Sequence, residues 1–68
     1  SAASDVYKRQ IYSSTVINSV IGDECKIKNA YIKNTNVADK IVVEPFAAIE
    51  SSMITENVAS GRIISRQV

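Results

Sequence analysis

The sequence predicts an all-β fold in which the chain winds into a triangular solenoid of about three coils. Aliphatic residues recur in steps of five or six, which fits neither a helical stripe nor a long strand. This column consists of Ile11, Val16, Ile21, Ile27, Ile32, Val37, Val43, Ile49 and Ile54. A second column, small at seven of its eight positions, stands two residues earlier: Ser14, Ser19, Cys25, Ala30, Thr35, Ile41, Ala47 and Ser52. Two inward residues separated by one outward residue are typical of a very short strand.

Three sequence blocks, residues 11–26, 27–42 and 43–58, align with each other at offsets of 16 and 17 residues. Each block holds three of the large inward residues, and it therefore provides three short strands and three corners. Gly22 and Ala38 follow the third strand of their blocks and are small enough for a corner. Five asparagines add residues that tolerate a left-handed backbone: Asn18, Asn29, Asn34, Asn36 and Asn57.

The two ends of the chain depart from this repeat. Residues 1–10, SAASDVYKRQ, match the translation of a transposon adapter used for sequencing libraries, so we expect a disordered scar there and coils over 11–57. A polar N-terminal arm is the alternative. Beyond Val58 the register weakens, because Ile63 follows Ile54 by nine residues. Residues 58–68 are therefore either an irregular tail or the start of a further coil, and we expect the chain to be a fragment of a longer reading frame.

The charge balance and the aromatic content of the chain limit the classes of partner that it could bind. Without Lys8, Arg9 and Asp5 the chain keeps six basic and six acidic residues, and its remaining aromatics are Tyr12, Tyr31 and Phe46. No basic stripe remains for a phosphate backbone, so we expect no nucleic acid partner. No apolar run reaches the length of a membrane span.

The cysteine and acidic side chains are expected to have packing or surface roles rather than catalytic or metal-binding ones. The chain has no histidine, which excludes Ser-His and Cys-His nucleophile pairs. Cys25 belongs to the small inward column and is expected to be a buried hydrophobe. Asp23 and Glu24 follow Gly22 at a corner where Asp39 recurs one coil later, which favours a solvated corner over a metal site.

The serines, aromatic residues and lysines also do not indicate a catalytic or metal-binding site. Ser51 and Ser52 lack a neighbouring base, and Ser52 lies in the inward column. Tyr31 and Phe46 are expected to point outward or to cap a corner, where they could meet a neighbouring domain or subunit. Four lysines could form a weak surface for anionic sugars or phosphate, although an ordinary solvated face is preferred: Lys26, Lys28, Lys33 and Lys40. We assign no catalytic, cofactor-binding or metal-binding residue to this segment.

The repeat resembles the hexapeptide pattern [LIV]-[GAED]-x-x-[STAVC]-x of left-handed parallel β-helix proteins. The residues that fit its second position are Gly22, Ala38, Glu44 and Glu50. This resemblance covers residues 11 to about 58 and implies a single-stranded left-handed parallel β-helix.

Two stretches point to particular enzymes within that group. VINSVIGDECKIKNAYIKN, residues 16–34, resembles the start of the β-helix in sugar-1-phosphate nucleotidyltransferases. VVEPFAAIE, residues 42–50, resembles the segment that follows in bifunctional UDP-N-acetylglucosamine diphosphorylase/glucosamine-1-phosphate N-acetyltransferases, whose Pro-Phe-Ala matches Pro45, Phe46 and Ala47. Those enzymes usually carry Gly at the position of Glu44 and an Arg-Pro pair where Glu50 and Ser51 stand. The Arg belongs to the acetyl-transfer site, so its absence places that activity in doubt here.

The resemblance implies a scaffold and oligomerisation segment of such a transferase, which makes UDP-N-acetylglucosamine-type nucleotide sugars as cell wall precursors. It implies a cytoplasmic homotrimer with an upstream Rossmann-like domain, and Mg²⁺, acetyl-CoA, sugar phosphate and nucleotide bound outside this segment. The segment alone is not expected to be catalytic. One alternative is a regulatory β-helix appendage of an ADP-glucose pyrophosphorylase-like enzyme, which Glu50-Ser51 favours. Another is part of a stand-alone hexapeptide acyltransferase.

Overall fold

The computed structural model describes residues 8–68, which form ten strands of two or three residues and no helix. The strands are β1 (Gln10–Tyr12), β2 (Thr15–Ile17), β3 (Val20–Ile21), β4 (Lys26–Lys28), β5 (Tyr31–Lys33), β6 (Asn36–Val37), β7 (Val42–Val43), β8 (Ala48–Glu50), β9 (Met53–Ile54) and β10 (Ile63–Ser65). The predicted all-β class is confirmed. Residues 8–68 also form no helix that could cross a lipid bilayer.

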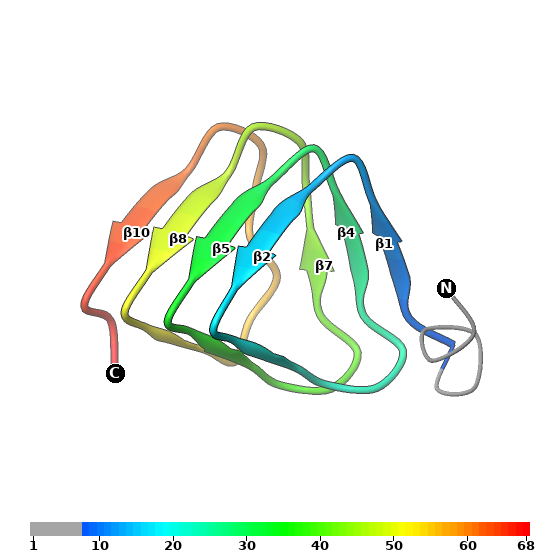
Figure 1. Cartoon of the computed structure of the whole chain (residues 1–68), viewed down its shortest axis with the longest axis horizontal. Coiled ribbons are helices and arrows are strands. Elements are labelled where there is room, and N and C mark those ends of the chain that lie inside the picture. The colour runs from blue at the N-terminus through cyan, green and yellow to red at the C-terminus, as the bar shows by residue number, and fades with distance from the viewer. Residues whose placement is uncertain (1–7) are drawn as a thin grey trace.

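The strands form three parallel sheets, one for each side of a triangular coil. The sheets are β1-β4-β7, β2-β5-β8-β10 and β3-β6-β9, so every third strand along the chain pairs with its equivalent in the next coil. Figure 1 shows β2, β5, β8 and β10 side by side as one wall and β1, β4 and β7 as another. Ile32, for example, pairs in parallel with Val16 on one side and Ile49 on the other. This arrangement is a parallel β-helix, as the repeat predicted.

The two predicted columns fill the interior. Every member from Ile21 to Ile54 is buried, and the largest fully buried side chains include Ile27, Ile32 and Ile49. Ile11 and Val16 are only partly buried, because within the described residues the first coil has a neighbouring coil on one side only. A continuous aliphatic core therefore runs along the helix axis and stabilises the stacked coils through apolar burial.

One residue at each of most corners adopts a left-handed backbone. Asn18, Asn29 and Asn34 do so, as expected, with φ between 46° and 52°. Asn36 lies within β6 and Asn57 does not have a positive φ, so these two asparagines do not adopt that conformation.

Gly22 is small because of a close approach between coils and not because of a positive φ. A Cβ atom at Gly22 would lie 2.6 Å from the backbone nitrogen of Asp39 and 2.6 Å from the backbone carbonyl carbon of Ala38. The left-handed residue of this corner is Glu24, and Lys40 is its equivalent in the next coil; both have a φ of 60°.

A further coil follows the three that the sequence predicts. Val58 forms a parallel bridge with Val43, and β10 pairs with β8. Ile64 is buried, whereas Ile63 is 81% exposed and points away from the core.

The register appeared to weaken here because one corner is shorter. Ile54 and Val58 are four residues apart, whereas Ile21 and Ile27 are separated by six at the equivalent corner. Within the short corner the side-chain Oδ1 of Asn57 accepts a hydrogen bond from the Val42 amide at 2.9 Å. In the coil before, the Lys26 amide donates instead to a backbone carbonyl, that of Ile41. The Asn57 amide group thus replaces a backbone acceptor.

The first strand begins at Gln10, the last residue of the adapter-like segment. Residues 1–7 lie outside the described residues, so the expected disorder of the adapter-like segment stays a prediction there. Gln10 is the first residue of β1 and pairs with Lys26, and Arg9 contacts the corner at Gly22 and Asp23.

Candidate functional site

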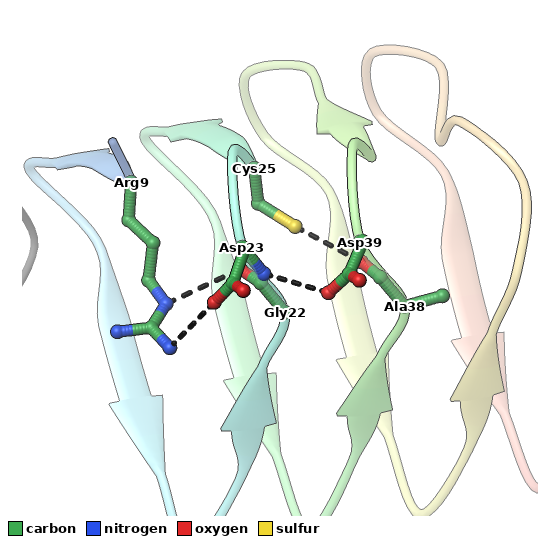
Figure 2. A network of polar contacts seen from close by, with 6 residues as sticks. All are labelled: Arg9, Gly22, Asp23, Cys25, Ala38 and Asp39. Atoms are coloured by element: carbon green, nitrogen blue, oxygen red, sulfur yellow. Dashed lines mark hydrogen bonds and ion pairs between the residues drawn. The ribbon is translucent and has the colours of Figure 1, made fainter. Parts of the chain in front are cut away.

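The acidic corner of the first two coils is a structural network (Figure 2). The Asp23 amide donates to Asp39 Oδ1 at 2.8 Å, and Asp23 Oδ1 forms an ion pair with Arg9 Nη2 at 3.3 Å. Arg9 Nε also donates to the Gly22 carbonyl at 3.2 Å. The carboxylates are used to join stacked corners, and residues 8–68 contain no group of three His, Cys, Asp or Glu that could hold a metal ion.

Cys25 is buried beside this corner, as the sequence predicts. Its side chain is 0% exposed, and its Sγ donates to the Ala38 carbonyl at 3.0 Å (Figure 2). A thiol that no solvent reaches is a packing residue rather than a nucleophile.

Hydroxyl groups of the small column form a ladder that the sequence did not reveal. Ser52 Oγ donates to the Glu50 carbonyl at 2.8 Å and accepts from the Gln67 amide at 2.9 Å. One coil earlier, Thr35 Oγ1 donates to Lys33 and accepts from the Ser52 amide. These hydroxyls continue the backbone hydrogen bonding across one corner of successive coils, so Ser52 has a structural role.

The four lysines do not share one surface. Lys26 and Lys28 lie on the outer side of β4, whereas Lys33 lies on β5 in a different sheet, and Lys40 occupies a corner. Of the four lysines, only the pair on β4 shares a surface.

That pair lines a groove of 380 Å³ on the outer face of the β1-β4-β7 sheet. We call it the β4 groove. Its apolar side chains are Tyr12, Val42 and Pro45, and its charged ones are Lys26, Lys28 and Glu44. Tyr12 is 59% exposed and Val42 37% exposed, so both present apolar area to solvent. The groove combines apolar walls with two lysines and one glutamate.

A second hollow, of 390 Å³, lies at the corner between β5 and β6 and is open and uncharged. It is lined mainly by amides, hydroxyls and Met53: Asn18, Asn34, Asn36, Ser51, Met53 and Val68. Two of its amides satisfy each other, since Asn18 Nδ2 donates to Asn34 Oδ1 at 2.7 Å. No charged side chain lines it.

The two singled-out aromatics point outward, as expected. Phe46 stands at the corner between β7 and β8 and is 74% exposed, and Tyr31 on β5 is 37% exposed. Ala48 lies two residues after Phe46 in the chain. In the sheet, Ala48 pairs with Tyr31 on one side and with Ile63 on the other. The outer surfaces of the coil, rather than its interior, therefore carry the unpartnered apolar groups.

Comparison with protein families identifies the repeat. The model of the GlmU-like, C-terminal hexapeptide family matches residues 1–67. The chain belongs to this family. The matched range includes the four coils and the whole adapter-like segment, residues 1–10. Neither the curated proteins nor the solved structures gave a match.

The GlmU-like hexapeptide assignment fits the position of the Pro-Phe-Ala segment, which forms the corner between β7 and β8. Glu50, at the end of β8, is exposed, and Ser51 has a φ of 53°. A proline ring fixes φ near about −65°, so this corner could not have its present shape with the Arg-Pro pair of the resembled enzymes. The backbone at Ser51 is therefore incompatible with the proline of that motif.

Proposed function

We propose that this chain is a scaffold and oligomerisation segment in the β-helix domain of a sugar-1-phosphate nucleotidyltransferase/acetyltransferase that makes UDP-N-acetylglucosamine-type nucleotide sugars. The family assignment and the four coils support it. One observation carries the scaffold role. The buried polar side chains of residues 8–68 all have hydrogen-bond partners, and large apolar side chains lie on the outer faces.

In this proposal the chemistry takes place elsewhere in the protein. The parent enzyme would use Mg²⁺ with a sugar phosphate and a nucleotide, and acetyl-CoA for acetyl transfer, as a cytoplasmic homotrimer. Residues 8–68 do not fit a Mg²⁺ site, because their acidic side chains do not converge on one point. We therefore assign no reaction step to this segment.

A second candidate is a regulatory β-helix appendage of an ADP-glucose pyrophosphorylase-like enzyme. Glu50 and Ser51 favour it, because they replace the Arg-Pro pair of the acetyl-transfer site and Ser51 has a backbone that proline cannot adopt.

The test begins with the flanking reading frame and continues with the full-length enzyme. An upstream nucleotide-binding domain is expected, with further coils and a histidine downstream. The purified enzyme should release pyrophosphate from UTP and N-acetylglucosamine-1-phosphate, and should release free CoA from acetyl-CoA with glucosamine-1-phosphate. Pyrophosphate release with ATP and glucose-1-phosphate alone would support the second candidate. A reading frame that has no nucleotide-binding domain would contradict both.

A further inference from the structure

Two lysines of the β4 groove lie on the same strand and lack a partner of opposite charge. Lys26 and Lys28 flank the buried Ile27, so both side chains leave β4 on its outer side. Each strand residue rises about 3.3 Å, which places their Cα atoms about 6–7 Å apart and lets one anionic group lie between the two ammonium groups. Within residues 8–68 neither lysine forms an ion pair or a side-chain hydrogen bond.

The sheet register places an aromatic ring beside one of these lysines. Tyr12 on β1 pairs with Lys28 on β4, and neighbouring strands lie about 4.8 Å apart. Tyr12, Val42 and Pro45 line the same groove and give it apolar walls. A ring bound there can pack against Tyr12 in an offset or edge-to-face arrangement, while an anionic substituent reaches the lysines.

Glu44 limits the charge that the groove can accept. It follows Val43, which pairs with Ile27, so it comes beside Lys28 in the next coil. Two lysines less one glutamate leave the lining with a net charge of +1. A ligand with several anionic groups would be repelled by the Glu44 carboxylate, whereas a ligand with one such group can place it toward Lys26.

The size of the groove limits the ligand in the same way. Its volume of 380 Å³ is near the lower end of the range of about 300–1,000 Å³ that is typical of small-molecule sites. It therefore suits a single ring with a short substituent.

We propose that the β4 groove binds a small aromatic ligand that carries one anionic group, either a carboxylate or a phosphate ester. The anionic group lies between Lys26 and Lys28, and the ring packs on Tyr12. This inference goes beyond the proposed scaffold role, since a ligand site on the outer face uses no step of the transferase reaction.

A titration of the ¹⁵N-labelled full chain, followed by nuclear magnetic resonance, tests the site. Benzoate and phenyl phosphate combine a ring with an anionic group, whereas benzyl alcohol has only the ring and inorganic phosphate only the charge. We expect a combined probe to shift the amide signals of residues 10–12, 26–28 and 42–45 with a dissociation constant on the order of 1 mM. The two single-feature probes should bind at least about fivefold more weakly.

Matched substitutions change the groove one charge at a time. Lys26→Gln and Lys28→Gln should each weaken binding of the combined probe by about two- to fivefold, as for exposed charge pairs. Glu44→Gln should strengthen it by a similar factor, because it removes a repulsive carboxylate. Lys33→Gln, on β5 in a different sheet, should leave the affinity unchanged. Tyr12→Ser should weaken the combined probe and leave inorganic phosphate unaffected.

The probes also separate the two sources of the anionic group. Binding of benzoate but not phenyl phosphate, or the reverse, would support the site and identify the source. Equal affinity for phenyl phosphate and inorganic phosphate would overturn the role of the ring, and equal affinity for benzoate and benzyl alcohol would overturn the role of the charge.

Two further results would overturn the site itself. One is the absence of shifts in residues 10–12, 26–28 and 42–45 at probe concentrations about tenfold above the expected constant. The other is an equal affinity in Lys26→Gln and Lys33→Gln. Either result leaves the scaffold role standing, since that role is tested by the reading frame and by the activity of the full-length enzyme.

Discussion

Gly22→Ala is the substitution for which the structure gives the sharpest expectation. The alanine Cβ would lie 2.5 Å from Asp39 Oδ1 and 2.6 Å from two backbone atoms of the next coil. Backbone atoms cannot rotate away as the end of a side chain can. The Asp39 corner must therefore shift, and the hydrogen bond between the Asp23 amide and Asp39 Oδ1, 2.8 Å long, is lost.

The magnitude follows from three contributions. Overpacking of this kind costs about 1–3 kcal/mol, and the lost hydrogen bond adds about 0.5–1.5 kcal/mol. The lower entropy of the unfolded alanine chain returns about 0.4–1 kcal/mol. We expect a net loss of about 2–3 kcal/mol in the free energy of unfolding, which for a domain of this size lowers the melting temperature by about 10–20 °C.

Thermal unfolding followed by far-ultraviolet circular dichroism measures this loss. Ala38→Gly is the matched control, since Ala38 occupies the equivalent position one coil later. It should cost only about 0.5–1 kcal/mol through backbone entropy. A Gly22→Ala chain that melts with the unsubstituted protein, or that loses less than Ala38→Gly, would refute the close approach of these corners.

Three further substitutions test the core and two side-chain hydrogen-bond acceptors at the corners. Ile32→Ala removes a side chain that is 0% exposed in a central coil and should cost about 2–5 kcal/mol in chemical denaturation; a loss below 1 kcal/mol would place Ile32 outside a packed core. Ser52→Ala removes the acceptor of the Gln67 amide and should cost about 1–3 kcal/mol, with faster hydrogen exchange at Gln67; unchanged exchange there would contradict the hydroxyl ladder. Asn57→Ala leaves the Val42 amide without its acceptor and should cost about 0.5–1.5 kcal/mol, with faster exchange at Val42, whereas Asn57→Asp should retain the bond. Equal exchange in both Asn57 variants would count against that bond.

The interior of the fold could be predicted from sequence because it depends only on the spacing of the aliphatic residues. Ile27, Ile32 and Val37 must face the axis for their coil to bury them, and their spacing reports the length of each side of the triangle. Cys25 could be placed inside for the same reason, from the column it shares with Ala30.

The corners could not be predicted so well, because their geometry depends on neighbours in other coils. The four-residue step at Val58 uses a side-chain acceptor from Asn57, and the sequence left open whether Ile63 or Ile64 belongs to the core of the next coil. A signal was available, since Asn57 stands directly before a β-branched aliphatic residue.

The candidate site was harder still to predict. The β4 groove forms from Tyr12, Lys28 and Val42, which lie in three successive coils and share no sequence motif. Register between coils brings them together. The 16-residue offset of the sequence blocks predicted that register, but it did not show which outward side chains would line a groove. Lys33 and Lys40 were grouped with the groove lysines on charge alone, and their different places in the coil separate them.

Sedimentation equilibrium of the full chain tests the central claim, that this segment is a β-helical scaffold built to associate through its outer surface. A single species with three times the 7.4 kDa mass of one chain is expected. A monodisperse monomer that unfolds cooperatively at every concentration would contradict it.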